Sequence, residues 1–427
     1  MNKVLIFIIS SVIRAFMQNK PSIFLISIGI GLTVTPPVLL MYGLGQFKVS
    51  ALVGDSEAIS WFGLCTAIVS AIMIVMGPGS GWVADRLYRW VGSRRLCMVI
   101  GSILGAVVLP GFALSPDLPS LILCWLAVNF CYGLVTTSGF ALVAVEVSLK
   151  SQGKVYGFIG MAIPLCAMAS IVLVMGLFAA SSMVTKLLLV AVLQVISVLL
   201  VVWRVSEQPY RPAAAELSSK RSHHYYPAFK QFPDFTWLLC SKLCLNTAIA
   251  GLKMMPLFYM ARLQINEQQV YELNALTAIG TVFLIIASIV TGYLCDRYGH
   301  IRRLNLIAPV IISLSLFGFS MADNTFEVIT ASCIMSVGLG ISGAVGNLLV
   351  NRVLPSFEQY SKDASLLNSS VHVGATLIGL LAPPLILWGT YWGGDGYEIF
   401  FILLAGIALL ASLFIMLIPA SRCEKRC

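Results

Sequence analysis

Long, unbroken runs of apolar residues limit what this chain can fold into more than any other feature. A helix needs about 20 mostly apolar residues to cross the hydrocarbon core of a bilayer, and twelve segments of the sequence meet that length. They cover residues 21–44, 59–82, 96–114, 121–145, 155–178, 187–204, 236–259, 273–294, 304–321, 328–350, 366–388 and 399–419. Continuous runs exclude a membrane β-barrel, whose strands alternate apolar and polar residues. The sequence therefore predicts an all-α integral membrane protein with twelve transmembrane helices.

The distribution of Lys and Arg predicts how these helices are oriented. Cytoplasmic loops of membrane proteins are enriched in both residues. With the N-terminus placed inside, the outer loops hold only Lys48, Lys186 and Arg262, and all other loop cations are cytoplasmic. One missed span would invert every later loop, so the asymmetry also supports the number of spans. We expect both termini in the cytoplasm and the protein in the cell (inner or plasma) membrane. The net charge of +9 expresses the same bias and predicts no nucleic-acid partner.

A polar stretch at residues 204–235 separates six spans from six. It predicts one six-helix bundle over 1–203, which opens with a short interfacial segment, then a cytoplasmic linker, then a second bundle over 236–427. The adjacent His223 and His224 of the linker are interpreted as solvated residues rather than metal ligands. The eleven Cys lack the paired spacing of a metal site. We expect no metal, no cofactor and a monomeric protein.

One charged pattern occurs twice, as GWVADRLYRWVGSRR at 81–95 and GYLCDRYGHIRR at 292–303. Each copy joins the second and third spans of its own half. A repeat with the same orientation in both halves predicts two pseudo-symmetric bundles about an axis normal to the membrane. Asp85 and Asp296 lie at a helix end, where each can face the Arg of its loop and the positive N-terminus of another helix. Gly81 and Gly292 allow neighbouring helices to approach closely.

On these residues the chain resembles the major facilitator superfamily, and the resemblance covers almost the whole sequence. The family signature maps onto Gly81, Asp85, Arg86, Gly92, Arg94 and Arg95, and again onto Gly292, Asp296, Arg297, Gly299, Arg302 and Arg303. Extra residues in the first copy make it similar to the longer form of sucrose-type and glycoside–cation symporters. The resemblance implies a secondary transporter, not an enzyme, that rocks around a central cavity. A charge cluster of this kind can latch the halves in one state and release them in the other, and each copy is predicted to latch the cytoplasmic end of its own bundle.

Span seven contains the polar residues that bear most on the cargo. In this family the first, fourth, seventh and tenth spans line the path. Lys242, Asn246 and Lys253 are spaced four and seven apart, which places them on one helix face. Two ammonium groups and an amide suit an anionic or strongly hydrogen-bonding solute, and charge inside a span is rare without function. In the alternative interpretation each lysine extends to its nearer membrane interface.

Further candidates lie in spans four, ten and eleven: Asn129, Tyr132, Thr136, Asn347 and His372. His372 can carry a coupled proton, because histidine titrates near physiological pH, or it can be a neutral packing residue. The others are weaker candidates, since Thr often bonds back to its own helix and Asn often joins helices.

The sequence favours transport of a small anionic or zwitterionic solute, such as a carboxylate, phosphate ester or peptide-like metabolite. Export is slightly favoured, because each negative charge that leaves a cell gains about 2.3 kcal/mol per 100 mV. A proton-coupled exporter of drugs or antibiotics is another alternative, but this chain has no carboxylate within its spans to hold a cationic drug. A sugar or metabolite uptake symporter is an alternative: this chain lacks the acids in spans two and four on which melibiose-type members rely, but recognition of a sugar by Asn129, Thr136 and Asn347 stays open. A membrane receptor or scaffold that does not transport is the alternative from a different functional class. Membrane lipid is the other expected partner.

Overall fold

The computed structural model describes residues 22–147, 151–178, 180–205, 207, 232–265, 267–354, 359–391 and 396–419. The described residues form helices, and no strand occurs among them. Eleven segments are long and apolar enough to cross a membrane, and the shorter apolar helix Ile23–Thr33 begins the remaining span. The predicted twelve-helix membrane fold is confirmed. Residues 208–231, with His223 and His224, lie outside the described residues, so the linker stays a prediction.

The first half begins with a segmented span: α2 (Ser22–Thr33), α3 (Thr35–Leu39), the π-helix η1 (Leu40–Leu44) and α4 (Gly45–Val53). The following spans are α5 (Asp55–Val91), α6 (Arg94–Leu114), α7 (Leu118–Glu146), α8 (Gln152–Ile171) with η2 (Val172–Leu177), and α9 (Met183–Arg204).

The second half begins with α10 (Pro233–Ala250), the 3₁₀ turn η3 (Gly251–Met254) and α11 (Met255–Arg262). Then come α12 (Glu267–Thr277) with α13 (Gly280–Tyr298), α14 (Ile301–Ser320), α15 (Thr325–Val353), α16 (Tyr360–Asn368) with α17 (Ser370–Thr390), and α18 (Tyr397–Met416).

Proline explains why the first and seventh spans are broken. Pro36 and Pro37 have no N–H for the carbonyls of Leu32 and Thr33, so the first span bends between α2 and α3. Pro256 removes the N–H that would bond Leu252, and the N–H of Met255 bonds that carbonyl instead, which tightens the chain into η3.

Short polar residues begin several of the helices. Ser93 accepts a hydrogen bond from the N–H of Leu96 at the start of α6, and Asn324 does the same for Glu327 at α15. Asp117 and Ser120 form a capping box at α7. Hydrogen bonds from the side chain and backbone of Ser120 lower the pKa of the Asp117 carboxyl.

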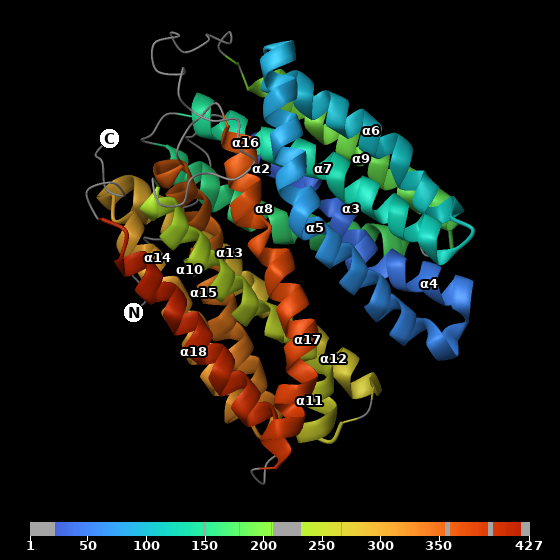
Figure 1. Ribbon diagram of the computed structural model, residues 1–427, viewed down its shortest axis with the longest axis vertical. Helices are drawn as coiled ribbons and strands as arrows, with labels where there is room; N and C mark the ends of the chain where they lie inside the picture. The colour runs from blue at the N-terminus through green and yellow to red at the C-terminus, as the bar shows by residue number, and fades with distance from the viewer. Residues whose placement is uncertain are drawn as a thin grey trace.

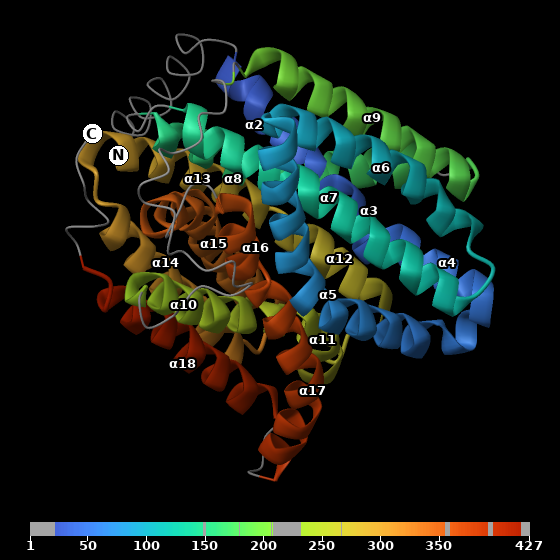
Figure 2. The ribbon, with the colours of Figure 1, turned by 45° about the horizontal axis from the view of Figure 1, so that its top comes forward.

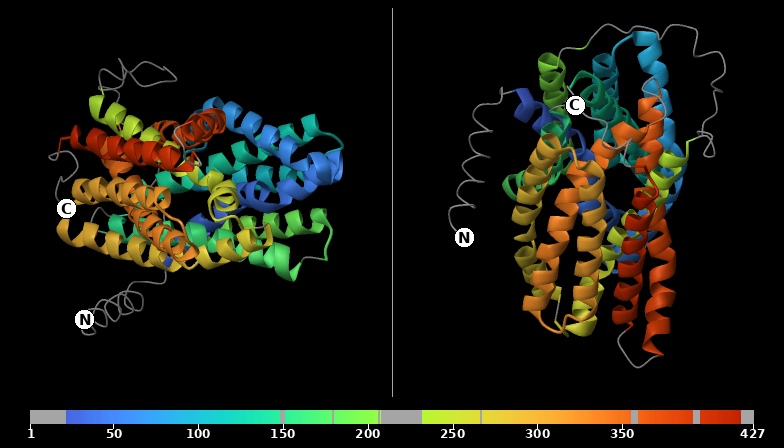
Figure 3. Two further views of the ribbon diagram at one scale, coloured as in Figure 1. Left: turned by 90° about the horizontal axis from the view of Figure 1, so that it is seen from below. Right: turned by 90° about the vertical axis from the view of Figure 1, so that its left-hand side faces the viewer.

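The described helices gather in two groups that join at one end (Figures 1 and 2). We call this the motif end, because the loops at 92–93 and 299–300 lie there; the opposite end is the far end. α8 lies beside α13 at the join, and α5 lies beside α16. The far ends of α5 and α17 diverge in Figure 1, and Figure 3 shows the same molecule from below and from the side.

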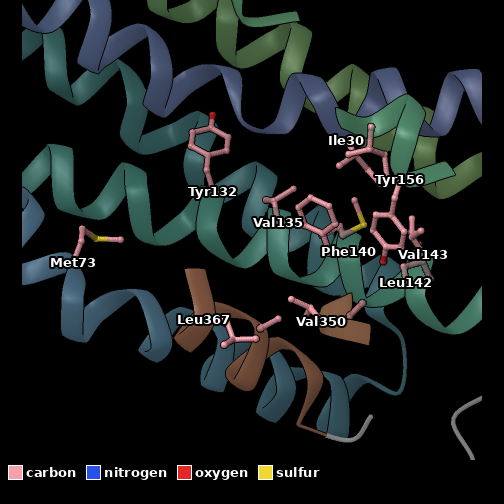
Figure 4. Close-up of a cluster of buried hydrophobic side chains, with 14 of the residues drawn as sticks. Ile30, Met73, Tyr132, Val135, Phe140, Leu142, Val143, Tyr156, Val350 and Leu367 are labelled. Carbon is pink, nitrogen blue, oxygen red and sulfur yellow. The ribbon is translucent and has the colours of Figure 1, made fainter. Parts of the chain in front are cut away.

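One hydrophobic core runs through the join. It starts within the first half, at residues such as Ile30 and Tyr132, and continues into Val350 and Leu367 of the second half (Figure 4). A second core, built around Phe258 and Phe401, lies inside the second half alone. The two halves therefore share buried apolar surface at the motif end.

Candidate functional site

The carboxylate of Asp85 caps a helix that belongs to the other half of the molecule. Its two oxygens accept hydrogen bonds from the backbone N–H groups of Ser361 (3.1 Å) and Lys362 (2.8 Å), in the first turn of α16. The guanidinium of Arg94 lies 3.3 Å away, and the Asp85 side chain is only about 3% exposed. A carboxylate at a helix N-terminus is stabilised by free N–H groups and by the helix dipole.

The second copy of the motif repeats this contact in the opposite direction. Asp296 accepts hydrogen bonds from the N–H groups of Gly153 (2.7 Å) and Lys154 (2.8 Å), in the first turn of α8. Each carboxylate thus binds the half to which it does not belong. This corrects the expectation that each copy latches its own bundle, because the second span of each half packs against the fifth span of the other.

The motif glycines make these contacts possible. A Cβ on Gly81 would lie 2.1 Å from the carbonyl oxygen of Ser361, and one on Gly292 would lie 2.4 Å from that of Gly153. The helix backbones are therefore in direct contact at both places. Gly92 and Gly299 act differently, since φ values of 74° and 66° place them in the left-handed region that ends α5 and α13.

The motif arginines do not all reach the join. Arg94 is buried, donates to the Ser361 hydroxyl (3.0 Å) and lies 4.2 Å from the Tyr88 ring centroid. Arg86 is exposed between Trp82 and Trp90, at 5.3 Å from each ring centroid. Arg297 is likewise exposed and donates to the Tyr293 hydroxyl (3.2 Å). Both side chains are exposed in this state, and their role in the gate stays a prediction.

The remaining motif arginines bind within their own halves. Arg95 donates to the carbonyl of Val202 at the end of α9, and Arg302 to that of Met416 at the end of α18. Arg303 is exposed. Arg95 and Arg302 thus link the third span of each half to the sixth span of the same half. These bonds stabilise each half internally and do not connect the two halves.

Glu207 belongs to this end of the molecule, although nothing in the sequence pointed to it. Its carboxylate accepts hydrogen bonds from the backbone N–H groups of Arg94 (2.7 Å) and Arg95 (3.3 Å) and from the Ser93 hydroxyl. It therefore caps α6 from a position 113 residues further along the chain. A contact so distant in sequence leaves no local pattern.

The two lysines of span seven differ in their relation to the helix break: Lys242 lies before it, and Lys253 lies within it. Lys242 is partly buried on α10, whereas Lys253 is exposed within η3. A 3₁₀ turn has about 3.0 residues per turn instead of 3.6, so the segment from Asn246 to Lys253 is not one continuous α-helix. The shared face of Lys242, Asn246 and Lys253 stays a prediction. Among the described residues neither lysine forms an ion pair with a carboxylate.

α17 contributes one predicted residue, His372, to this region. Asn246 donates a hydrogen bond to the Ser370 hydroxyl (2.7 Å), and Lys253 lies close enough to His372 for their charges to interact. The two helices touch at Gly374, where a Cβ would lie 2.8 Å from the backbone nitrogen of Thr247. Lys253, Asn246 and His372 thus belong to one region, at the contact between α10 and α17.

The candidates of span four do not join them. Asn129 donates to the carbonyl of Trp125 and Thr136 to that of Tyr132, both at 2.8 Å. The Tyr132 ring packs against Gly105 of α6, and in Figure 4 it points away from Val350 and Leu367. Tyr132 is therefore part of the interior of the first half.

Thr136 and Asn347 lie beside contacts with other helices. Thr136 lies 3.5 Å from the Thr33 hydroxyl, beside the break in span one. Asn347 is partly buried, one helical turn after Gly343, which faces Gly160 of α8.

Comparison with known proteins gives a consistent result. The model of the Major Facilitator Superfamily matches residues 21–360 and 254–425. No curated protein matches the chain.

Three solved structures share the fold over nearly their whole length. The proton:xylose symporter XylE bound to 6-bromo-6-deoxy-D-glucose has a TM-score of 0.71 at 14% identity, over 94% of this chain and 96% of that one. The human organic anion transporter MFSD10 (TETRAN) has a TM-score of 0.69 at 15% identity, over 93% and 100%. The transporter FucP in the outward conformation has a TM-score of 0.67 at 13% identity, over 93% and 99%. Identities this low show a common fold only.

Proposed function

Because the chain belongs to the major facilitator superfamily, a family of transporters rather than enzymes, we propose that it carries a small organic anion or zwitterion across the cell membrane by alternating access. The cargo class comprises carboxylates, phosphate esters and peptide-like metabolites. Export is the favoured direction, and His372 is the candidate carrier of a coupled proton.

The observation that carries this proposal is the pair of lysines without a carboxylate partner in span seven. A cation inside a membrane span is costly and is normally paired or functional. Lys242 and Lys253 have no acidic partner among the described residues. An anionic group of the cargo would supply the missing charge. Broken helices are also where transporters of several folds bind their substrates, and Lys253 lies in such a break.

We assign the main cargo contacts to Lys253, Lys242, Asn246 and His372. Asn347, Asn129 and Thr136 are weaker contacts, because the latter two already bond to their own helix. Tyr132 is left out, since its ring packs between α6 and α7. If the motif end is cytoplasmic, as the basic loops predict, the described state is closed toward the cytoplasm and exposes Lys253 toward the outside.

Replacing Lys253 by Ala is expected to reduce transport about tenfold, because a hydrogen bond to a charged group typically contributes 1.5–3 kcal/mol. Metabolites inside and outside cells are compared for null, wild-type and Lys253→Ala strains. We expect an anionic compound to accumulate inside the null and Lys253→Ala strains. Lys186→Ala, a lysine on α9 outside this region, serves as the matched control and should behave as wild type.

Each other result has a definite meaning. If a compound fails to enter the null cells, the direction of transport is uptake rather than export. If the compound that differs between the strains is a neutral sugar, the proposed cargo class is wrong. If Lys253→Ala behaved as wild type while the null strain did not, the lysine would be an interfacial residue and the anion proposal would be wrong.

A further inference from the structure

Three buried side chains, which we call the ring, are linked by hydrogen bonds where the two halves join. The Asn351 amide nitrogen donates to the Tyr156 hydroxyl (2.7 Å), and the Tyr360 hydroxyl donates to the Asn351 amide oxygen (2.7 Å). The two tyrosine hydroxyls thus bond to opposite ends of one amide. Tyr156 belongs to α8 of the first half, whereas Asn351 and Tyr360 belong to α15 and α16 of the second.

Each side chain of the ring has a partner inside it: the Tyr360 hydroxyl donates, the Tyr156 hydroxyl accepts, and the Asn351 amide uses both of its ends. The side chains are deeply buried, with exposed fractions of 0% for Tyr156, 7% for Asn351 and 2% for Tyr360. A buried network that is fully satisfied is specific in geometry, whereas one that loses a member leaves an unsatisfied group.

The ring lies among apolar side chains, unlike the charged contacts of Asp85 and Asp296. The ring of Phe140 stacks on that of Tyr156, with centroids 6.3 Å apart and an interplanar angle of 11° (Figure 4). Val350 and Leu367 belong to the same hydrophobic core. Tyr360 directly precedes Ser361, whose N–H is capped by Asp85. The ring therefore joins the halves through uncharged groups, one residue away from a charged contact.

We propose that Asn351 is a positioning residue of the transport cycle, which holds the motif end closed by linking Tyr156 to Tyr360 across the join. The bond between Tyr156 and Asn351 exists only while α8 and α15 touch. When the halves separate, water can replace each hydrogen bond of the ring one for one. The ring thus stabilises the closed state but does not prevent the motif end from opening. The inference rests on the alternating access proposed above, but not on the identity of the cargo.

Hydrogen–deuterium exchange of the full-length protein in lipid nanodiscs tests this inference without labels or substrate. Opening of the motif end exposes the amides of residues 151–156 and 359–365, and closure of the far end protects those of α4 and α11. We expect Tyr156→Phe and Asn351→Leu each to speed exchange at the motif end about tenfold and to slow it at the far end. Tyr132→Phe is the matched control, because it removes a buried hydroxyl inside one half.

A triple variant separates the ring from ordinary packing. Tyr156→Phe, Asn351→Leu and Tyr360→Phe together remove every polar group of the ring, and replacing all partners by apolar groups of similar shape is nearly neutral. We expect exchange at the motif end to return close to the wild-type rate. Faster exchange than in either single variant would overturn the ring and indicate loose packing.

A further comparison separates failure of this inference from failure of alternating access. If the single variants exchange as wild type while Asp85→Asn opens the motif end, the ring has no role but the rocking motion stands. If none of the variants, Asp85→Asn included, alters exchange at either end, the ring has no role and alternating access fails with it.

Discussion

Replacing Asp85 by Asn is expected to reduce transport more than about a hundredfold. The substitution removes the charge that holds the first turn of α16 and leaves the buried guanidinium of Arg94 without its carboxylate. Breaking a buried ion pair on one side typically costs 3–5 kcal/mol, and each 1.4 kcal/mol is a factor of ten. The state closed at the motif end would become rare, and the cycle slows in proportion to its population.

Asp296→Asn is the natural comparison for this experiment. Asp296 accepts two backbone hydrogen bonds, but no arginine pairs with it among the described residues. Its loss should therefore reduce transport less than the loss of Asp85. Uptake or efflux rates of both variants, measured at equal membrane abundance, decide the order. A chain that tolerated Asp85→Asn without loss would not rock, and the receptor or scaffold alternative would gain support.

Replacing Gly81 by Val is the second change with a large expected effect. Its Cβ alone would lie 2.1 Å from the carbonyl oxygen of Ser361, which is backbone and cannot turn aside. Overpacking of a tight contact costs 1–3 kcal/mol and occasionally more, and here the whole cost falls on the closed state. We expect transport to fall about a hundredfold, with faster hydrogen exchange at residues 359–365.

Gly63→Val provides a matched control on the same helix. Nothing lies within 4 Å of a Cβ built on Gly63, so the two variants differ in contact but share the effect of valine on α5. Equal losses in both would mean that valine disturbs the helix itself, and the close approach of α5 to α16 would not matter for transport.

The elements of this fold were readable from sequence because each depends on local composition. Apolar length alone located the twelve spans, and the repeated Asp-Arg pairs located the ends of α5 and α13. The missing N–H groups of Pro36, Pro37 and Pro256 account for the breaks in the first and seventh spans, which the structure revealed. The 3₁₀ turn that contains Lys253 was not expected, because α-helical spacing was assumed throughout span seven.

The partners across the join were not predictable in the same way. Asp85 contacts residues 276 and 277 positions away, and Glu207 reaches α6 over more than a hundred residues. Tyr156, Asn351 and Tyr360 each look like ordinary core or helix-end residues in their own segments. Their chemistry arises only when three helices from two halves meet, and no spacing within one helix encodes that meeting.

The exchange of caps between the halves also bears on where such a chain comes from. The second span of each half binds the fifth span of the other, once through Asp85 and once through Asp296. A contact in which the same patch serves both partners is isologous, the form taken by two-fold symmetric homodimers. The halves thus meet as two identical six-helix subunits would. Fusion into one chain makes that association independent of subunit concentration. It also allows the two copies of the motif to differ, and they do: among the described residues Asp85 pairs with a buried arginine, whereas Asp296 does not.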